Sequence, residues 1–271
     1  MKPVDFAYAQ PVSIAAAVDA LSASNGNAKI MAGGQTLGPM LNLRFVQPDL
    51  VLDISRIPEL RHVEERAGTM IIGACTTHAA IEDGRVPDVA RGMLPHIASR
   101  IAYRAIRTRG TIGGSLAHAD PAADWVSCLT ALRAVVCVVG ARGRRDVPIE
   151  QFIRGPLETA LDEAEIIERV VVHGLSPNAR WGYHKICRKT GEFAEAIGAV
   201  VIDRDVCRLV AGATSGKPVV VELPAADVAS RTRSTSEIKA MLAAAGLHGD
   251  SYDMSIHTAA VRRALQEATA A

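Results

Sequence analysis

Thr111-Ile112-Gly113-Gly114-Ser115, together with Ala32-Gly33-Gly34-Gln35-Thr36 nearer the N-terminus, decides how this chain is interpreted. Each stretch ends in a hydroxyl residue, and each follows an apolar run that is typical of a strand. Paired glycines lack Cβ atoms and allow positive φ, so successive backbone N–H groups can converge on the oxygens of a diphosphate. We call residues 32–37 the first bend and residues 111–115 the second bend, and we expect two clamps on one large nucleotide. Glycine pairs also occur in ordinary turns, so a purely structural interpretation of either bend stays open.

The segment after the second bend predicts a helix. Asp120 and Pro121 are typical of an N-cap and of a first helical position, so we expect a helix from Pro121 to about Ala134 with Asp124 near its start. Neither bend has the glycine spacing of a Rossmann or a Walker site. His118, Asp120 and Asp124 are of metal-ligand type, but the capping role open to Asp120 favours no metal here.

The rest of the chain mixes helical and strand-like periodicity, which predicts an α+β fold. Apolar runs predict strands over 28–32, 50–54, 69–73, 135–140 and 166–172. Helical spacing predicts helices over 12–24, 77–83 with Thr77 as cap, and 89–102. After a linker at 174–178 we expect three strands over 196–202, 207–213 and 218–223, with helices over 236–245 and 255–268.

Composition excludes several classes of function. The chain has 271 residues, 49% of them hydrophobic, and a formal net charge of +1, so no global field attracts nucleic acid. The N-terminal residues include an acidic residue and prolines where a signal peptide needs an unbroken apolar stretch, and no apolar run is long enough to span a bilayer, so we expect a cytoplasmic protein. The five cysteines lack C-x-x-C spacing, and an electron-transfer role would need an organic cofactor or clusters on another chain.

Three motifs carry a family resemblance over nearly the whole chain. They are the Ala-Gly-Gly-x-Thr-Leu bend at 32–37, the long string from Arg109 to Asp124, and Arg188-Lys189-Thr190-Gly191-Glu192-Phe193-Ala194. In this order they resemble the FAD-binding medium subunits of molybdenum hydroxylases, the family of the carbon monoxide dehydrogenase medium subunit and the xanthine dehydrogenase FAD subunit. The chain departs from the commonest pattern at Thr36, where the family has serine, and at Gly38-Pro39, which replace a bulkier pair.

The resemblance implies a fold, a cofactor and partners. The expected fold is a two-lobed FAD-binding domain of the vanillyl-alcohol-oxidase (PCMH) type at 1–175, with lobes of about 1–57 and 58–175. A small α+β domain with a three-stranded sheet and helices is expected at 176–271. FAD would be the cofactor of this chain, with 2Fe-2S clusters on a small partner subunit and molybdopterin on a large one, in a dimer of heterotrimers. The flavin would take electrons from the clusters and pass them to an external acceptor, while the large chain would select the substrate.

The resemblance also assigns residues to the flavin. The cofactor-binding set that it implies is Ala32, Gly33, Gly34, Gln35, Thr36, Leu37, Thr111, Gly113, Gly114, Ser115, Ala117, His118, Asp124, Ile167 and Lys185. Asp124 would accept hydrogen bonds from the ribityl chain or ring, and Lys185 would stabilise charge on the reduced ring and raise its potential. Tyr183 would contact the ring. The alternatives are that Asp124 only favours a helix dipole, that Lys185 is an exposed lysine, and that Tyr183 and Ile167 fill the core.

Two other functions stay open on the sequence. One is a self-sufficient flavin oxidase or reductase on the same FAD-binding fold, to which substrate has direct access. The other is a nucleotide-binding interaction module without redox chemistry. A Ser-His-Asp hydrolase is disfavoured because the chain has no G-x-S-x-G elbow.

Overall fold

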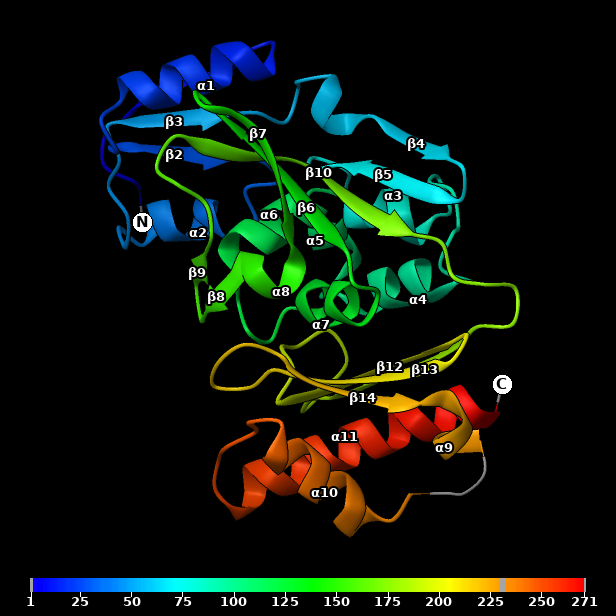
Figure 1. Cartoon of the computed structure of the whole chain (residues 1–271). Coiled ribbons are helices and arrows are strands. Elements are labelled where there is room, and N and C mark those ends of the chain that lie inside the picture. The colour runs from blue at the N-terminus through cyan, green and yellow to red at the C-terminus, as the bar shows by residue number, and fades with distance from the viewer. Residues whose placement is uncertain (1, 230–232, 271) are drawn as a thin grey trace.

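The computed structural model describes residues 2–229 and 233–270, and Figure 1 shows an upper part above a lower part. The upper part contains a three-stranded and a five-stranded sheet, and the lower part contains a four-stranded sheet. The upper part runs from the N-terminus to the end of β10, and the lower part runs from β11 to the C-terminus. This mixture of helices and separate sheets is the α+β fold that the sequence predicts. No helix within the described ranges is long and apolar enough to cross a membrane.

The first sheet is small and parallel. Its strands, in spatial order, are β1 (Ala7–Ala9), β3 (Leu50–Asp53) and β2 (Ala28–Met31). The crossover from β1 to β2 is α1 (Ile14–Ala23), which the Ser13 hydroxyl caps by accepting a hydrogen bond from the backbone N–H of Ala16. The first bend follows the carboxyl end of β2 and leads into α2 (Leu37–Asn42). Ligands of open parallel sheets bind at this end of the strands.

The second sheet is antiparallel and has five strands. In spatial order they are β4 (Val63–Arg66), β5 (Thr69–Gly73), β10 (Glu165–His173), β6 (Val135–Gly140) and β7 (Gly143–Pro148). Five helices lie between β5 and β6 in the chain: α3 (His78–Glu82), α4 (Met93–Arg100), α5 (Arg104–Arg107), α6 (Ile112–His118) and α7 (Asp124–Ala131). The remaining short elements are η1 (Glu59–Arg61), α8 (Ile149–Phe152), β8 (Ile153–Gly155) and β9 (Glu158–Thr159).

The lower part is a four-stranded antiparallel sheet between helices. Its strands are β11 (Arg180–Ile186), β12 (Ala196–Asp203), β13 (Val206–Gly212) and β14 (Val219–Pro224), in that spatial order. Its helices are α9 (Ala225–Ala229), α10 (Thr235–Ala244) and α11 (Ser251–Ala270). Helix α7 lies on the upper side of the sheet, and α10 and α11 lie below it (Figure 1). A Cβ at Gly198 would lie 2.3 Å from the backbone oxygen of Ala260, so glycine lets α11 approach the sheet closely.

The main hydrophobic core is continuous between the two parts. It joins Trp125 of α7 and Val170 of β10 to Ile197, Ala199 and Val210 on the lower sheet, and all five side chains are buried. A second cluster fills the space between the lower sheet and its helices, and a third lies under α1.

Most expected elements are confirmed. The expected strands correspond to β2, β3, β5, β6, β10, β12, β13 and β14, and the expected helices near 12–24, 77–83, 236–245 and 255–268 correspond to α1, α3, α10 and α11. Thr77 caps α3 as predicted, because its hydroxyl accepts a hydrogen bond from the N–H of Ala80. The lower sheet has the three expected strands and a fourth, β11, which carries Tyr183 and Lys185.

Three local predictions were wrong. The helix near the second bend begins at Asp124 and not at Pro121, because Asp120 accepts a hydrogen bond from the N–H of Ala122 and holds residues 120–123 in a turn. The helix expected over 89–102 is limited to α4, which begins after Gly92 at φ +82. The second bend follows the helix α5 rather than a strand, and it is itself the start of α6.

Candidate functional site: two glycine bends and a buried ion pair

The first bend leaves hydrogen-bond donors uncommitted. Gly34 has φ +70, and its carbonyl accepts the first helical hydrogen bond of α2, from the N–H of Gly38 at 2.9 Å. The backbone N–H groups of residues 34–37 precede that bond and have no intrahelical acceptor. Thr36 occupies the N-cap of α2 and makes no side-chain capping bond, and among the described residues its hydroxyl has no hydrogen-bond partner. The side chain of Gln35 is used locally, donating to the Gly33 carbonyl at 3.2 Å.

In the second bend, the backbone N–H groups of residues 112–115 have acceptors within the protein. The N–H groups of Ile112 and Gly113 donate to the carbonyls of Thr76 and Ala74, at 3.0 and 2.9 Å. The Thr111 hydroxyl caps α6 by accepting a hydrogen bond from the N–H of Gly114 at 3.0 Å. A Cβ at Gly113 would lie 2.5 Å from the Cβ of Ala74, so this glycine is required for packing. The N–H groups of Gly113 and Gly114 therefore have acceptors within the protein, and their expected contact with FAD stays a prediction.

The two bends touch each other. A Cβ at Gly33 would lie 2.2 Å from the carbonyl oxygen of Arg109 and 2.8 Å from the Cα of Gly110. A Cβ at Gly114 would lie 3.8 Å from the Cβ of Ala32. Glycine at position 33 thus permits close backbone contact with the segment that enters the second bend. One ligand can therefore meet both bends.

Asp124, Tyr183 and Lys185 form one buried cluster. The Tyr183 hydroxyl donates to Asp124 Oδ1 at 2.6 Å, and Lys185 Nζ lies 3.0 Å from Asp124 Oδ2. The side chains of Asp124 and Lys185 are each 6% exposed, so Lys185 is not the exposed lysine that one interpretation allowed. Burial raises the pKa of Asp124 above its usual value, while the Lys185 cation opposes that rise. The cluster joins the first turn of α7 to β11.

The other candidate residues lie at varied depths. Ile167 is buried in the main core on β10, at the point where the pairing of β10 with β6 shifts register. Ala117 is exposed and His118 is partly buried, both on α6. Among the described residues, no group of His, Cys, Asp and Glu side chains could hold a metal ion. Asp124 is instead engaged by Lys185 and Tyr183.

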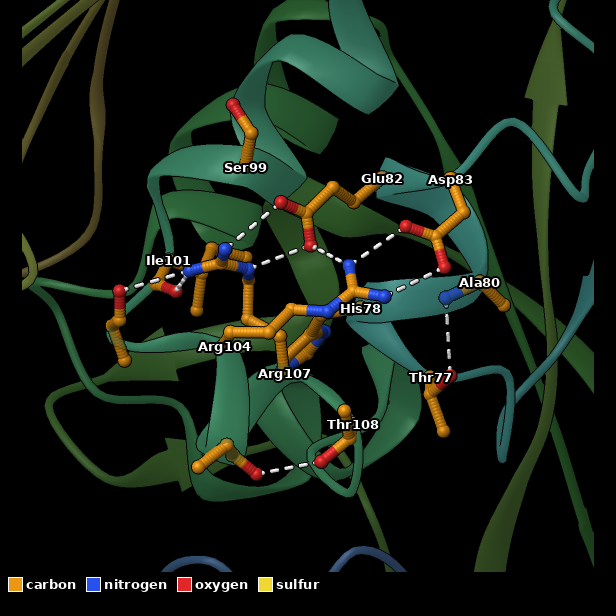
Figure 2. Close-up of polar contacts among 12 residues, drawn as sticks. Thr77, His78, Ala80, Glu82, Asp83, Ser99, Ile101, Arg104, Arg107 and Thr108 are labelled. Atoms are coloured by element: carbon orange, nitrogen blue, oxygen red, sulfur yellow. Dashed lines mark hydrogen bonds and ion pairs between the residues drawn. The ribbon is translucent and has the colours of Figure 1, made fainter.

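Sequence reasoning missed the residues that support the second bend. The backbone N–H of His78 donates to the Gly110 carbonyl at 2.9 Å, and the Trp125 indole N–H donates to His78 Nδ1 at 2.9 Å. Burial lowers the pKa of His78 to about 4, so the imidazole is neutral near pH 7. Figure 2 shows His78 beside an ion-pair network that Glu82 and Arg107 share with two neighbouring charged residues. These partners are 21 to 47 positions apart in the sequence, and no local pattern links them.

Comparison with known proteins decides the family. Residues 4–172 match the model of the FAD binding domain in molybdopterin dehydrogenase. The chain belongs to this family. Its cofactor is FAD, and it is a flavoprotein of the molybdopterin-dependent oxidoreductases.

This chain is similar to medium subunits of named enzymes. The nicotine 6-hydroxylase medium subunit of Paenarthrobacter nicotinovorans is 37% identical over 273 residues, which cover 97% of this chain and 93% of the relative. The carbon monoxide dehydrogenase medium chain of Hydrogenophaga pseudoflava is 39% identical over 202 residues, which cover 74% and 70%. A solved structure of carbon monoxide dehydrogenase from Hydrogenophaga pseudoflava aligns with a TM-score of 0.88 at 33% identity, covering 100% of this chain and 99% of the solved chain.

The residues present fit FAD. The first bend offers uncommitted N–H groups and the Thr36 hydroxyl, which are the donors that a diphosphate needs. Few side chains lie where the two bends touch, so the diphosphate of FAD can approach the protein backbone there. Asp124 keeps acceptor capacity beyond its two present bonds, because each carboxylate oxygen has two lone pairs.

Proposed function

We propose that this chain is the electron-transfer subunit of a multisubunit molybdenum hydroxylase. It would take electrons from iron-sulfur clusters on a small partner subunit and pass them to an external acceptor, while a large molybdopterin subunit oxidises the substrate. The observation that carries the proposal is the contact of a donor-rich first bend with the second bend, in a chain of the FAD-binding family. The names of the relatives, which are medium chains and subunits, support a multisubunit assembly.

The proposal divides the binding tasks between the bends. Residues 34–37 hold the diphosphate by backbone donation, with Thr36 adding its hydroxyl. The second bend, with Ser115, supplies a wall close to the first bend, and Ala117, His118 and Ile167 line the remainder. When bound, FAD supplies the site that accepts and releases electrons.

The buried cluster orients and tunes this site in the proposal. Asp124 accepts from a hydroxyl or N–H of the cofactor, and Tyr183 and Lys185 hold the Asp124 carboxylate in place. The Lys185 cation raises the potential of the cofactor by favouring added negative charge. Because Asp124 partly neutralises Lys185, this effect is smaller than that of an unpaired lysine.

The proposal retains the expected division of the chain. Residues 1–175 form the FAD-binding domain, with the parallel sheet in the lobe of about 1–57 and the five-stranded sheet in the lobe of about 58–175. Residues 176–271 form the C-terminal domain. A cytoplasmic dimer of heterotrimers is the proposed assembly.

Reconstitution and partner identification test the function. The purified chain is mixed with FAD, separated from free cofactor, and examined by visible absorption; we expect about one flavin per chain. A tagged chain expressed in its native host is then isolated, and co-purifying chains are identified by mass spectrometry. We expect one iron-sulfur chain and one molybdopterin chain, and reduction of the flavin on adding substrate to the complex. Isolation of a flavin-loaded chain without partners would contradict the electron-transfer role.

The alternative is a self-sufficient flavin oxidase or reductase. It predicts turnover of a single added substrate by the reconstituted chain without partner chains. Full activity of the chain by itself would establish this alternative.

A further inference from the structure

Helix α5 contributes no fully buried hydrophobic side chain. It is a single turn of four residues, and none of them is buried. Charged contacts attach it to α3 instead, as Figure 2 shows. Arg107 pairs with both carboxylate oxygens of Glu82 at 2.8 Å each, and Arg104 pairs with both oxygens of Asp83 at 2.7 and 2.8 Å.

Arg107 is less exposed to solvent than Arg104. Its side chain is 12% exposed against 49% for Arg104, and that of Glu82 is 18% exposed. Arg107 also donates to the carbonyls of Ile101 and Ala102, both at 3.0 Å. A planar guanidinium can make all these bonds at once, whereas a lysine cannot. Hydrogen bonds from Arg107 also lower the pKa of Glu82, which keeps this carboxylate ionised.

Both ends of α5 lead to the candidate site. At its C-terminal end, the Ile106 carbonyl accepts from the N–H of Gly110 at 2.7 Å, and the neighbouring Arg109 carbonyl meets Gly33 of the first bend. At its N-terminal end, the Tyr103 ring lies against Gly191, where a Cβ would be 2.8 Å from the ring. Gly191 follows β11, the strand that carries Lys185. Helix α5 is therefore a short link between the first bend and the segment after β11.

We propose that Glu82 and Arg107 are positioning residues for FAD: by fixing α5 on α3, they set the spacing between the two bends without touching the cofactor. The proposal rests on the FAD site proposed above. A ligand that spans both bends binds best when their spacing is already correct, because no binding energy is then used to order the protein.

Arg107→Met and Glu82→Gln test the proposal. The dissociation constant of FAD is measured by fluorescence titration of the cofactor-free protein. We expect it to rise about tenfold to a hundredfold, the equivalent of losing one hydrogen bond to a charged group. Arg107→Lys keeps the charge but loses the paired geometry, so it should give an intermediate value. The visible spectrum at saturating FAD should match that of the wild type, since neither residue contacts the ring.

Arg145→Met is the matched control. Arg145 makes the same kind of contact, pairing with both oxygens of Glu165 and donating to the Ala160 carbonyl, but these partners lie in neither bend. It should lower the thermal midpoint of the cofactor-free protein to a similar extent while changing the FAD dissociation constant less than about twofold. Equal changes in the Arg107 and Arg145 variants would overturn the positioning role, as would a shifted visible spectrum in the Arg107 variant.

The outcomes distinguish a failure of the positioning role from a failure of the proposed FAD site. If the wild type binds no FAD, the proposed site fails. If the wild type binds FAD and both Arg107→Lys and Glu82→Gln bind it equally well, the site stands and the positioning role fails. Should Arg107→Met not fold, the comparison of these two milder variants with Arg145→Met decides the question.

Discussion

The two glycine bends look alike in sequence and differ in what their glycines do. In the first bend, Gly33 allows two backbones to touch, Gly34 adopts a positive φ, and the following N–H groups are uncommitted. In the second bend, Gly113 packs against Ala74, and the donors of Gly113 and Gly114 are used within the protein. A glycine pair therefore does not reveal whether it binds a ligand or allows close packing. The hydrogen bonds of its N–H groups distinguish the two roles.

Among the variants that test this comparison, Gly33→Val should have the largest effect on FAD binding and stability. The new side chain would collide with the backbone at Arg109, so we expect loss of FAD binding and a fall of about 3 kcal/mol in the free energy of unfolding. Gly114→Val should also remove FAD binding, because it would displace the Thr111 hydroxyl and fill the space towards Ala32. Urea unfolding and flavin content after gel filtration measure both effects. Gly38→Ala is the control, since a Cβ there meets nothing within 4 Å, and stoichiometric FAD in either valine variant would contradict the two-bend site.

Lys185→Met tests the buried cluster beside the second bend. It leaves the Asp124 carboxylate without its cation, and breaking such a buried pair costs about 3–5 kcal/mol of unfolding free energy. In reconstituted protein, Lys185→Met should also lower the flavin midpoint potential. The double variant Lys185→Met with Asp124→Asn should recover part of the unfolding free energy and part of the midpoint potential. Strictly additive effects in this double-mutant cycle would argue against the pairing, and an unchanged potential would remove the tuning role.

His78→Phe should change the pH dependence of stability. With its pKa lowered to about 4, His78 binds a proton more readily in the unfolded chain, so its contribution is complete above about pH 6.5 and is lost as the pH falls towards 4. Removing the imidazole should reduce the loss of stability between pH 7 and pH 5 by about 2 kcal/mol. Urea unfolding at the two pH values measures this difference. A pH dependence as steep in His78→Phe as in the wild type would contradict the lowered pKa of His78.

The smallest effects on stability and FAD binding are expected from Thr111→Ala and Thr36→Ala, which separate the roles of the two bends. Thr111 caps α6, so its loss should cost about 1 kcal/mol of stability. Thr36 makes no capping bond, so its loss should leave stability within about 0.5 kcal/mol. The proposed bond from Thr36 to the diphosphate predicts a rise of about tenfold in the FAD dissociation constant. If Thr111→Ala impaired FAD binding more than Thr36→Ala, the proposed division of labour between the bends would be wrong.

The sequence predicted elements better than it predicted their local chemistry. Periodic strands such as β6 and β10 and the helix α11 follow from local patterns, because their apolar residues repeat along the chain. The start of α7 was wrong because the Asp120 side chain forms a turn as readily as a cap. The fourth strand of the lower sheet, β11, was missed because charged residues interrupt its sequence, whereas β12 and β13 are nearly continuous apolar runs.

The sequence predicted which residues form the site better than it predicted the hydrogen bonds and ion pairs between them. The resemblance placed Asp124 and Lys185 near one cofactor, and the structure shows that they also pair with each other. The roles of Glu82, His78 and Arg107 depend on contacts between distant segments, which no spacing rule reveals. The sequence also did not show that N–H groups of the second bend have acceptors within the protein, because those acceptors are carbonyls of residues 74–76, which lie beside the bend only in the folded chain.

The continuous core has a consequence for how this chain is made. Strands β12 and β13 supply Ile197, Ala199 and Val210 to the same core as Trp125 and Val170, yet they leave the ribosome after the whole upper part. Until they emerge, the nascent upper part exposes apolar surface that its own residues do not cover. Such an intermediate is prone to aggregate and is a natural client for chaperones during synthesis. A gene fragment ending near residue 175 should therefore yield mostly insoluble product.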